Sequence, residues 1–371
     1  MRKPLHEQAV VITGASSGIG RQTALEFARR GASLTLAARN DAALRALAEE
    51  IRHNGGKAQV VVTDVAEWDQ VDRLAREAVA KYGRVDTWVN NAGVSVYAHF
   101  EDLSIEEIDR VIQVDLMGQI YGAKAILPHM RKQGSGTIIN VGSMVSKRSV
   151  PLQSIYSAAK HAVKGFTDAL RIELEHERAG IQVTLILPGS INTPFFSNAR
   201  SKMGYKAAPP NPVYQPEAVA EAIVHAAEHP LRDVFIGFAA KAADLIERVS
   251  PDLGDQLQLA GGYGFESQKS GEPDNGRDNL LGPVAGPGRT HGEHAGHASS
   301  WYTRVFELNP GLKYAAAGLA AVGTVGLVAA LARRTARPSL PLPSLDGHGN
   351  GYGRALASGI DSGLRTIGVK S

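Results

Sequence analysis

The segment TGASSGIG, residues 13–20, constrains the fold of this 371-residue chain more than any other feature. It follows a short apolar run, Ala9 to Thr13, and leads into a stretch with helical spacing that begins at Ile19. An apolar run that ends at a glycine turn favours a buried parallel strand whose carboxyl end faces a ligand. The helix that follows points its positive dipole end and its free backbone N–H groups at the same place. The sequence therefore predicts a site for an anionic pyrophosphate.

The glycines of this turn have distinct expected parts. Gly14 permits the tight turn, Gly18 lets the backbone approach a phosphate, and Gly20 lets the helix pack against the strand. The alternative is a plain strand-to-helix turn, because glycine-rich turns occur in many folds that bind no nucleotide. The motifs further along the chain favour the binding site. The expected cofactor contacts in the turn are Gly14, Ser16, Ser17, Gly18, Ile19 and Gly20.

Strand-like and helix-like segments alternate along the first two thirds of the chain. A second apolar run, Ser33 to Ala38, is followed by a helical pattern from about residue 41 to 53, and this order repeats. Such alternation implies a parallel sheet covered on both faces, and right-handed crossovers make it doubly wound. We therefore predict an α/β fold with one Rossmann-type catalytic domain over residues 1–255. Further strands are expected at 87–90, 137–141, 183–187 and 234–237, with helices near 104–131, 154–179 and 216–229.

The composition changes after about residue 255. Residues 261–300 are dominated by Gly, Pro, Ser, His and charged residues, with little apolar material to offset the entropy of ordering them. We therefore expect a flexible linker over residues 256–310. An apolar, membrane-associated or packed helix is expected over residues 311–334, and a disordered tail over residues 335–371.

The uncharged run Tyr314 to Ala332 leaves two alternatives open. It is long enough to cross a bilayer, but it is rich in alanine and glycine, so its insertion would be marginal. Its glycines could also let two such helices approach closely. Residues 314–332 are therefore expected either to associate with a membrane or to form a buried or self-associating helix.

Charge and cysteine content exclude several function classes. The formal net charge is +3, and the basic residues are scattered along the chain, so nothing indicates nucleic-acid binding. Without cysteine, the chain cannot carry a disulfide framework, a thiolate nucleophile or a Cys-ligated metal. The N-terminus lacks the apolar stretch and cleavage site of a signal peptide, so we expect a cytoplasmic location.

The end of the second expected strand bears on the type of cofactor. In dinucleotide folds an acidic residue here binds the ribose 2′-OH, whereas an arginine accommodates a 2′-phosphate. This strand ends in Ala37, Ala38 and Arg39, and a guanidinium pairs with phosphate through charge-assisted hydrogen bonds. We therefore predict NADP(H) rather than NAD(H). The alternative is that Arg39 is only a solvated loop cation.

Polar residues also follow the third and fourth strands, at the edge where doubly wound sheets carry their ligand-binding loops. Asp64 could hold the adenine amino group, and Asn91 could tie neighbouring strands together or bind the ribose. Asparagine and glycine also simply make turns. The expected cofactor contacts here are Asp64, Val65, Asn90, Asn91, Ala92 and Gly93.

Three residues predict the chemistry. Tyr156 and Lys160 stand four apart in YSAAK, and Ser143 lies upstream at the end of an expected strand. Positions i and i+4 share a helix face, so the ammonium can stand beside the phenol and lower its pKa. Such a phenol can exchange a proton with an alcohol or carbonyl oxygen, which the serine can hold. Alone, this pair is usually a surface pair, but after the glycine turn it predicts a hydride-transfer enzyme.

TGASSGIG, NNAG, Ser143, YSAAK and the PG of LPGSINTP together resemble the short-chain dehydrogenase/reductase family, over residues from about 5 to 250. The resemblance implies hydride transfer between the cofactor and a carbonyl or secondary alcohol. It implies that Tyr156 is the general acid/base, that Ser143 orients the substrate, and that Lys160 also binds the nicotinamide ribose. It further implies a homodimer or homotetramer. Nicotinamide contacts are implied for Pro188, Gly189, Ile191 and Thr193.

One position departs from the family pattern. The family usually places an asparagine in the central helix, in a pattern like NxxG, where it helps to hold a water that relays protons from the lysine. The matching residue here is Asp115, in VDLMG. An ionised carboxylate only accepts hydrogen bonds, and its charge near Lys160 would oppose the lysine's effect on the tyrosine. We expect Asp115 to take the relay position, with a shifted pH optimum.

Apolar residues dominate the loops expected over the nicotinamide, and such a pocket favours a small apolar ketone, aldehyde or secondary alcohol. The competing function is a non-catalytic nucleotide-binding scaffold or cofactor sensor on the same fold, which the intact Ser143, Tyr156 and Lys160 argue against. A dehydratase or epimerase is less favoured, because such enzymes usually act on nucleotide sugars within longer substrate domains. The loops, at 94–100, 144–153 and 195–212, contain Val96, Tyr97, Phe100, Met144, Val145, Leu152, Phe195, Phe196 and Met203.

Overall fold

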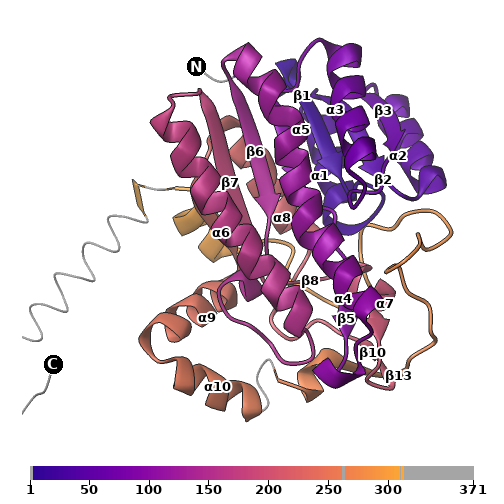
Figure 1. Cartoon of the computed structure of the whole chain (residues 1–371), viewed down its shortest axis with the longest axis vertical. Coiled ribbons are helices and arrows are strands. Elements are labelled where there is room, and N and C mark those ends of the chain that lie inside the picture. Colours follow the sequence, from indigo (N-terminus) through magenta and orange to yellow (C-terminus); the bar gives the residue numbers. More distant parts are fainter. Residues whose placement is uncertain (1–2, 261–263, 310, 313–371) are drawn as a thin grey trace, which may run out of the picture. The chain divides into compact units, whose positions relative to one another are not determined.

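A seven-stranded parallel sheet forms the centre of the fold (Figure 1). The computed structural model describes residues 3–260, 264–309 and 311–312. The strand order is β12-β7-β6-β4-β1-β2-β3, and every neighbouring pair is parallel. The predicted α/β, doubly wound fold is confirmed. The strands are β1 (Ala9–Thr13), β2 (Ser33–Ala38), β3 (Lys57–Val62), β4 (Thr87–Asn90), β6 (Gly136–Val141), β7 (Ile181–Pro188) and β12 (Asp233–Ile236).

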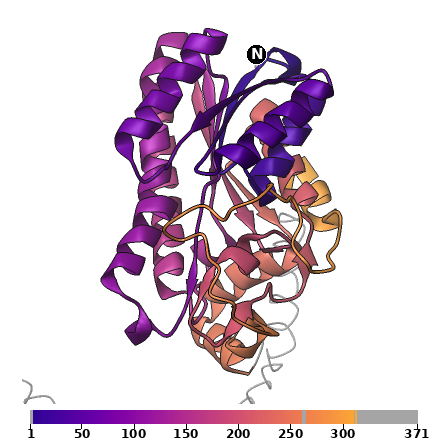
Figure 2. The same ribbon diagram turned by 90° about the vertical axis from the view of Figure 1, so that its right-hand side faces the viewer.

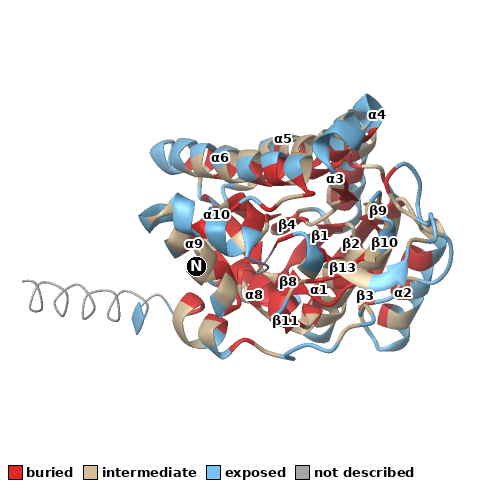
Figure 3. Ribbon diagram, turned by 90° about the horizontal axis from the view of Figure 1, so that it is seen from below, coloured by how far each residue is buried: buried red, intermediate tan, exposed pale blue. Residues whose placement is uncertain are grey.

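Helices cover both faces of this sheet. Seen from below in Figure 3, α5 and α6 lie on one side of the strands, and α1 and α8 lie on the other. The first layer also holds α3, which packs on α5. Between consecutive strands of the sheet the chain passes through one or more helices, as the crossovers of a parallel sheet require. The helices are α1 (Gly18–Arg29), α2 (Asp41–His53), α3 (Trp68–Tyr82), α4 (Ile105–Ile112), α5 (Gly118–Gln133), α6 (Ser154–His176) and α8 (Pro216–Glu228).

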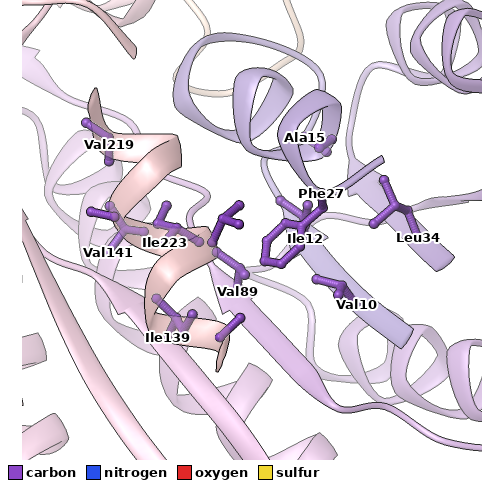
Figure 4. Close-up of a cluster of buried hydrophobic side chains, with 14 of the residues drawn as sticks. Val10, Ile12, Ala15, Phe27, Leu34, Val89, Ile139, Val141, Val219 and Ile223 are labelled. Carbon is purple, nitrogen blue, oxygen red and sulfur yellow. The ribbon is translucent and has the colours of Figure 1, made fainter. Parts of the chain in front are cut away.

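Alternating side chains of β1 pack into two separate hydrophobic cores. Val10 and Ile12 point into a cluster under α1 and α8, which includes Phe27 and Ile223 (Figure 4). Val11 joins the cluster on the opposite face of the sheet. Successive strand residues point to opposite faces, so an all-apolar strand has to be covered on both sides. Phe27 is fully buried, and burial of such a side chain stabilises the fold by about 1.5–3 kcal/mol.

The helix expected near residues 104–131 contains a local irregularity. Helix α4 begins at a capping box, in which Ser104 and Glu107 satisfy each other's backbone N–H groups. Between α4 and α5 the chain forms a π-helical turn, Gln113–Met117. Single π-helical turns inside α-helices are frequent at functional sites, and this one carries Asp115.

The residues that follow β12 pack on the domain, in contrast to the flexible linker expected over 256–310. Helices α9 (Phe238–Val249) and α10 (Pro251–Leu259) come first, and β13 (Lys269–Pro273) then pairs antiparallel with β10 (Tyr205–Ala207). The composition is poor in apolar residues, but Leu280 and Leu308 are buried. Backbone hydrogen bonds and side-chain ion pairs, such as Arg200 with Asp278 and Arg304 with Glu221, supply further contacts that composition does not reveal. The other short elements are β5 (Val96–Tyr97), α7 (Phe195–Asn198), β8 (Ser190–Ile191), β9 (Arg200–Ser201) and β11 (Val213–Tyr214).

Among the described residues, no helix has both the length and the apolar character to cross a membrane. The run 314–332, for which membrane association or self-association was expected, lies outside the described residues. The same holds for the tail expected over 335–371.

Candidate active site

A cavity of about 690 Å³ lies at the carboxyl edge of the sheet. It runs from the glycine turn to Ser143, Tyr156 and Lys160, so it joins the predicted phosphate site to the predicted catalytic residues. The carboxyl edge is where doubly wound sheets bind their ligands. The cofactor contacts predicted from sequence that line it are Gly14, Ser16, Ser17, Gly18, Ile19, Arg39, Asp64, Val65, Asn91, Ala92, Gly93, Pro188, Gly189, Ile191 and Thr193.

The glycine turn is shaped by residues from three strands. Gly14 and Gly18 have φ angles of 67° and 55°, which side chains disfavour. A Cβ added to Gly14 would come within 2.8 Å of the Ala92 Cα, and one added to Gly20 would overlap the carbonyl oxygen of Gly14. Gly20 therefore serves the packing of helix on strand. The turn leaves a concave surface in front of the N-terminus of α1, where an anion is favoured.

Asn91 and Asn90 have structural contacts of different kinds. The Asn91 side chain donates to the carbonyl oxygens of Thr13 and Gly14, at 3.0 and 3.3 Å, so it ties β4 to the glycine turn. Asn90 was expected to contact the cofactor, but it does not line the cavity. Its amide donates to Asn140 at 2.9 Å and accepts from Trp88 at 2.7 Å, inside the protein. Because β4 side chains alternate between faces, the second asparagine reaches the cavity edge and the first enters the core.

Arg39 and Asp64 line the cavity at the end away from the predicted catalytic residues. The Arg39 guanidinium donates to the carbonyl oxygens of Asn279 and of Leu280, the latter at 3.1 Å. Asp64 pairs with Arg110 at 2.6 Å. Burial lowers the pKa of Arg39, the charge of Arg110 lowers it further, and Asp64 opposes both. Sequence reasoning missed Arg110, because only the fold brings α4 beside the end of β2.

The three predicted catalytic residues lie together at the other end. Ser143 follows β6 directly, and Tyr156 and Lys160 share one face of α6. The Lys160 Nζ lies 5.6 Å from the centre of the Tyr156 ring and 3.2 Å from the carbonyl oxygen of Val141. A hydrogen bond joins the side chains of Ser143 and Tyr156. The structure therefore brings the three residues together, with the tyrosine hydroxyl at the serine.

The electrostatics of Tyr156 differ from the sequence expectation. Burial raises the pKa of Tyr156 above its ordinary value, the Asp115 carboxylate raises it further, and the hydrogen bond from Ser143 opposes both. Lys160 was expected to lower this pKa. Its ammonium pairs with Asp115 Oδ1 at 3.2 Å, and the carboxylate charge offsets the effect of the ammonium charge on the phenol.

Asp115 is buried beside Lys160, one of the predicted catalytic residues. Its Oδ2 accepts a hydrogen bond from the backbone N–H of Val94 at 3.0 Å, and its Oδ1 faces Lys160. Burial raises the pKa of Asp115, and the charge of Lys160 and the Val94 hydrogen bond oppose this shift. Asp115 thus lies beside the lysine, as its match to the family's asparagine position implied.

The wall beyond Tyr156 is mostly apolar. Phe195 packs on Tyr156 with ring centres 5.7 Å apart. Four of the residues expected in this wall do not line the cavity: Val96, Phe100, Leu152 and Met203. Phe100 is 62% exposed. The residues that do line it at this end are Val94, Tyr97, Met144, Val145, Val150, Gln153, Phe195, Phe196, Pro210 and Gln268.

Comparison with known proteins agrees with this geometry. A family model described as short chain dehydrogenase matches residues 8–204. The oxidoreductase YxnA of Bacillus subtilis is 41% identical over 307 residues, which cover 81% of this chain and 86% of that protein. The mouse dehydrogenase/reductase SDR family member 7B is 35% identical over 261 residues, covering 67% of this chain and 79% of that protein.

Two solved structures share the fold. A short-chain dehydrogenase/reductase from Burkholderia phymatum, in complex with NAD, superposes with a TM-score of 0.61 at 27% identity and covers 66% of this chain and 94% of its own. An alcohol dehydrogenase from Thermococcus sibiricus, complexed with 5-hydroxy-NADP, has a TM-score of 0.55 at 28% identity and covers 62% of this chain and 95% of its own. By its motifs, its fold and these likenesses, the chain belongs to the short-chain dehydrogenase family of oxidoreductases.

Proposed function

We propose that this protein transfers a hydride between NADP(H) and an apolar ketone, aldehyde or secondary alcohol. One observation carries the proposal: Ser143, Tyr156 and Lys160 line the same cavity as the glycine turn. Hydride transfer to a carbonyl needs a place for the dinucleotide and a group that exchanges the proton at one site, and here the glycine turn and Tyr156 would supply them. A non-catalytic scaffold would need only the first of them.

The residues present suit a dinucleotide. The positive φ angles of Gly14 and Gly18 keep the turn free of side chains where phosphates approach, and a Cβ at Gly18 would lie 3.1 Å from the Thr193 Cβ. Asp64 and Val65 would lie beside the adenosine, and Ile191 and Thr193 beside the nicotinamide. When bound, the cofactor supplies or accepts the hydride at its nicotinamide ring.

The chain's own residues would handle the proton. In carbonyl reduction, the Ser143 hydroxyl holds the substrate oxygen, and Tyr156 donates its hydroxyl proton to the alkoxide that forms. The raised pKa of Tyr156 keeps this hydroxyl protonated at neutral pH, which suits the general acid. Alcohol oxidation needs the ionised phenol, so this direction requires a higher pH. The protonated phenol is thus the form that carbonyl reduction needs near neutrality.

The preference for NADP(H) rests on the charges at the end of β2. Arg39 and Arg110 lie close enough for the second to lower the pKa of the first, and the carboxylate that opposes this is Asp64. A 2′-phosphate would bring negative charge to these two guanidiniums, with charge-assisted hydrogen bonds in place of the neutral carbonyl acceptors that Arg39 now has. A higher kcat/KM with NADH than with NADPH would contradict this assignment.

Asp115 is proposed as a positioning residue for Lys160 and as the member of the proton relay that replaces the usual asparagine. Its two oxygens fix the Val94 amide and the lysine ammonium, so it holds Lys160 next to Tyr156. Its negative charge also keeps the phenol protonated.

The substrate wall favours small apolar molecules. Met144, Val145, Phe195 and Phe196 line the cavity beyond Tyr156 and offer a hydrophobic surface to a ketone or aldehyde. Turnover of NADPH with a panel of aromatic and alicyclic ketones tests the function. No oxidation of NADPH by any of them, with normal cofactor binding, would favour the scaffold instead. The homodimer or homotetramer stays a prediction, which light scattering on the purified protein tests.

A further inference from the structure

Residues 278–290, named the strap here, cross the mouth of the cofactor cavity. They lie beyond residues 8–204, which the family model matches. In Figures 1 and 2 the strap belongs to the orange segment, and Figure 2 shows this segment crossing the side of the domain that faces the viewer. Strap residues from Pro283 to Arg289 line the cavity opposite the glycine turn.

One end of the strap is fixed at the predicted adenosine end of the cavity. The Leu280 carbonyl oxygen accepts from Arg39 at 3.1 Å and from Arg110 at 3.0 Å. The Leu280 side chain is fully buried and joins the hydrophobic cluster that contains Val65. Leu280 therefore anchors the strap to two residues that we propose bind the adenosine half.

The other end is fixed at the predicted phosphate end. The backbone N–H of Gly18 donates to the carbonyl oxygen of Arg289 at 2.9 Å, and Arg21 donates to Thr290 at 2.8 Å. A Cβ at Gly288 would overlap the carbonyl oxygen of Ser16, so the strap backbone lies directly against the turn. An amide of the phosphate turn thus bonds to the strap.

Two further contacts hold the strap along its length. Arg200 Nε donates to Asp278 Oδ2 at 2.9 Å, and Asn40 Nδ2 donates to the Val284 carbonyl oxygen at 2.8 Å. Three of the groups that hold the strap, Arg39, Asn40 and Gly18, also line the cavity. Opening or closing of the strap and occupation of the cavity must be coupled, since they involve the same groups.

We infer that the strap is a hinged cover of the dinucleotide site, which must release its Leu280 anchor for the cofactor to enter and to leave. The inference rests on the proposed function in one respect, that the ligand is a nicotinamide dinucleotide. A cavity of about 690 Å³ remains beside the strap, and a pyrophosphate at the glycine turn would replace the Arg289 carbonyl oxygen as the partner of the Gly18 N–H. The match to the Bacillus relative covers 81% of this chain, which leaves at most about 70 residues unmatched before it or after it. Residues 278–290 lie within the matched part in either case, so that relative has a counterpart of the strap.

Stopped-flow measurement of NADPH binding, without substrate, tests the cover. Leu280→Ala removes the buried anchor, and the adjacent Leu281→Ala, at a residue that is 45% exposed, is the matched control. We expect Leu280→Ala to raise both the association and the release rate constants by roughly tenfold, because loss of buried leucine packing populates the open strap. Leu281→Ala should match the wild type. An unchanged release rate in Leu280→Ala would overturn the inference.

A label on the strap gives a second readout. The chain has no cysteine, so Leu281→Cys provides a single thiol for an environment-sensitive fluorophore. We expect its emission to change during NADPH binding, with a rate that Leu280→Ala accelerates; binding without any change in emission would count against the cover. NADH in place of NADPH separates the two proposals, because accelerated binding of NADH alone would retain the cover and contradict the cofactor assignment. Normal gating without turnover of any carbonyl would contradict only the proposed activity.

Discussion

Lys160 Nζ lies 3.2 Å from Asp115 Oδ1, in an ion pair whose side chains are 4% and 0% exposed. In such surroundings a charge acts strongly on its neighbours, because little water screens it. The ion pair therefore determines how strongly the Lys160 ammonium can lower the pKa of Tyr156. The carboxylate raises the pKa of Tyr156, in addition to the effect of burial.

Asp115→Asn should shift the pH dependence of alcohol oxidation to lower pH. Oxidation needs the ionised phenol, and removal of the carboxylate lowers the pKa of Tyr156, so the rise of kcat/KM with pH should move down by roughly one unit. Steady-state rates across a pH series measure the shift. Asp109→Asn, on the exposed face of α4, serves as the control. An unmoved profile in Asp115→Asn would remove the proposed role of Asp115.

Arg39→Gln should weaken the preference for NADPH. Loss of charge-assisted hydrogen bonds to a 2′-phosphate should lower kcat/KM for NADPH by roughly 10–100-fold, whereas the value for NADH should change by less than about twofold. Arg110 still holds the Leu280 carbonyl, so one strap contact persists in this variant. Arg45→Gln, an exposed arginine of α2, is the matched control. Equal losses with both cofactors would show that Arg39 acts on the strap and not on the 2′-phosphate.

Gly20→Ala should abolish cofactor binding. The added Cβ would overlap the Gly14 carbonyl oxygen, so the phosphate turn would have to shift away from the helix. We expect the Kd for NADPH to rise by at least roughly 100-fold, since the turn positions every phosphate contact. Gly165→Ala is the control, because a Cβ there meets nothing within 4 Å, and it should stabilise α6 slightly. Isothermal titration of both variants with NADPH decides the matter; normal affinity in Gly20→Ala would contradict the assigned turn.

Glu107→Gln should lower stability at neutral pH and not at low pH. Burial alone would raise the pKa of Glu107, but hydrogen bonds from Lys202, the Ser104 backbone and Arg200 lower it to about 2. Because its pKa is lower in the folded state, ionised Glu107 stabilises the folded protein at pH values above 4.5, the pKa of the unfolded state. This stabilisation is lost as the pH falls toward 2.

The size of this effect follows from the shift, which corresponds to a loss of about 3 kcal/mol or less in the free energy of unfolding at neutral pH. The difference between variant and wild type should narrow below pH 4.5. Urea unfolding at several pH values measures it, with the exposed neighbour variant Glu106→Gln as reference. A pH-independent difference would mean that packing, not charge, stabilises this position.

Much of the fold was predictable, because short apolar runs in the sequence indicate the strands of its sheet. The apolar runs of β1, β4 and β6 have no polar face, and only a parallel sheet covered on both sides buries such strands. The approach of Ser143, Tyr156 and Lys160 follows from the same topology, since β6 and α6 are consecutive. The position of Asp115 beside Lys160 followed from the family pattern.

The rest depends on contacts that local patterns do not encode. Arg110 reaches the end of β2 only after α4 folds across the sheet edge, so no spacing pointed to it. In the strap only the Leu280 side chain is fully buried, and backbone carbonyl oxygens that accept from Arg39, Arg110 and Gly18 supply much of its order. Composition describes side chains and not backbone hydrogen bonds, so the low apolar content of this region predicted a flexible linker over residues 256–310. The raised pKa of Tyr156 was not predicted, because it depends on how deeply the phenol is buried and on how near the Asp115 carboxylate lies.

NADPH oxidation with the ketone panel, compared between wild type and Tyr156→Phe, decides whether this phenol is the general acid. We expect turnover by the wild type and a fall in kcat of roughly 10²–10⁴-fold in Tyr156→Phe, with the Kd for NADPH unchanged, because only the proton donor is lost. Tyr156→Phe that reduces ketones as fast as the wild type would contradict the assignment of this phenol as the general acid.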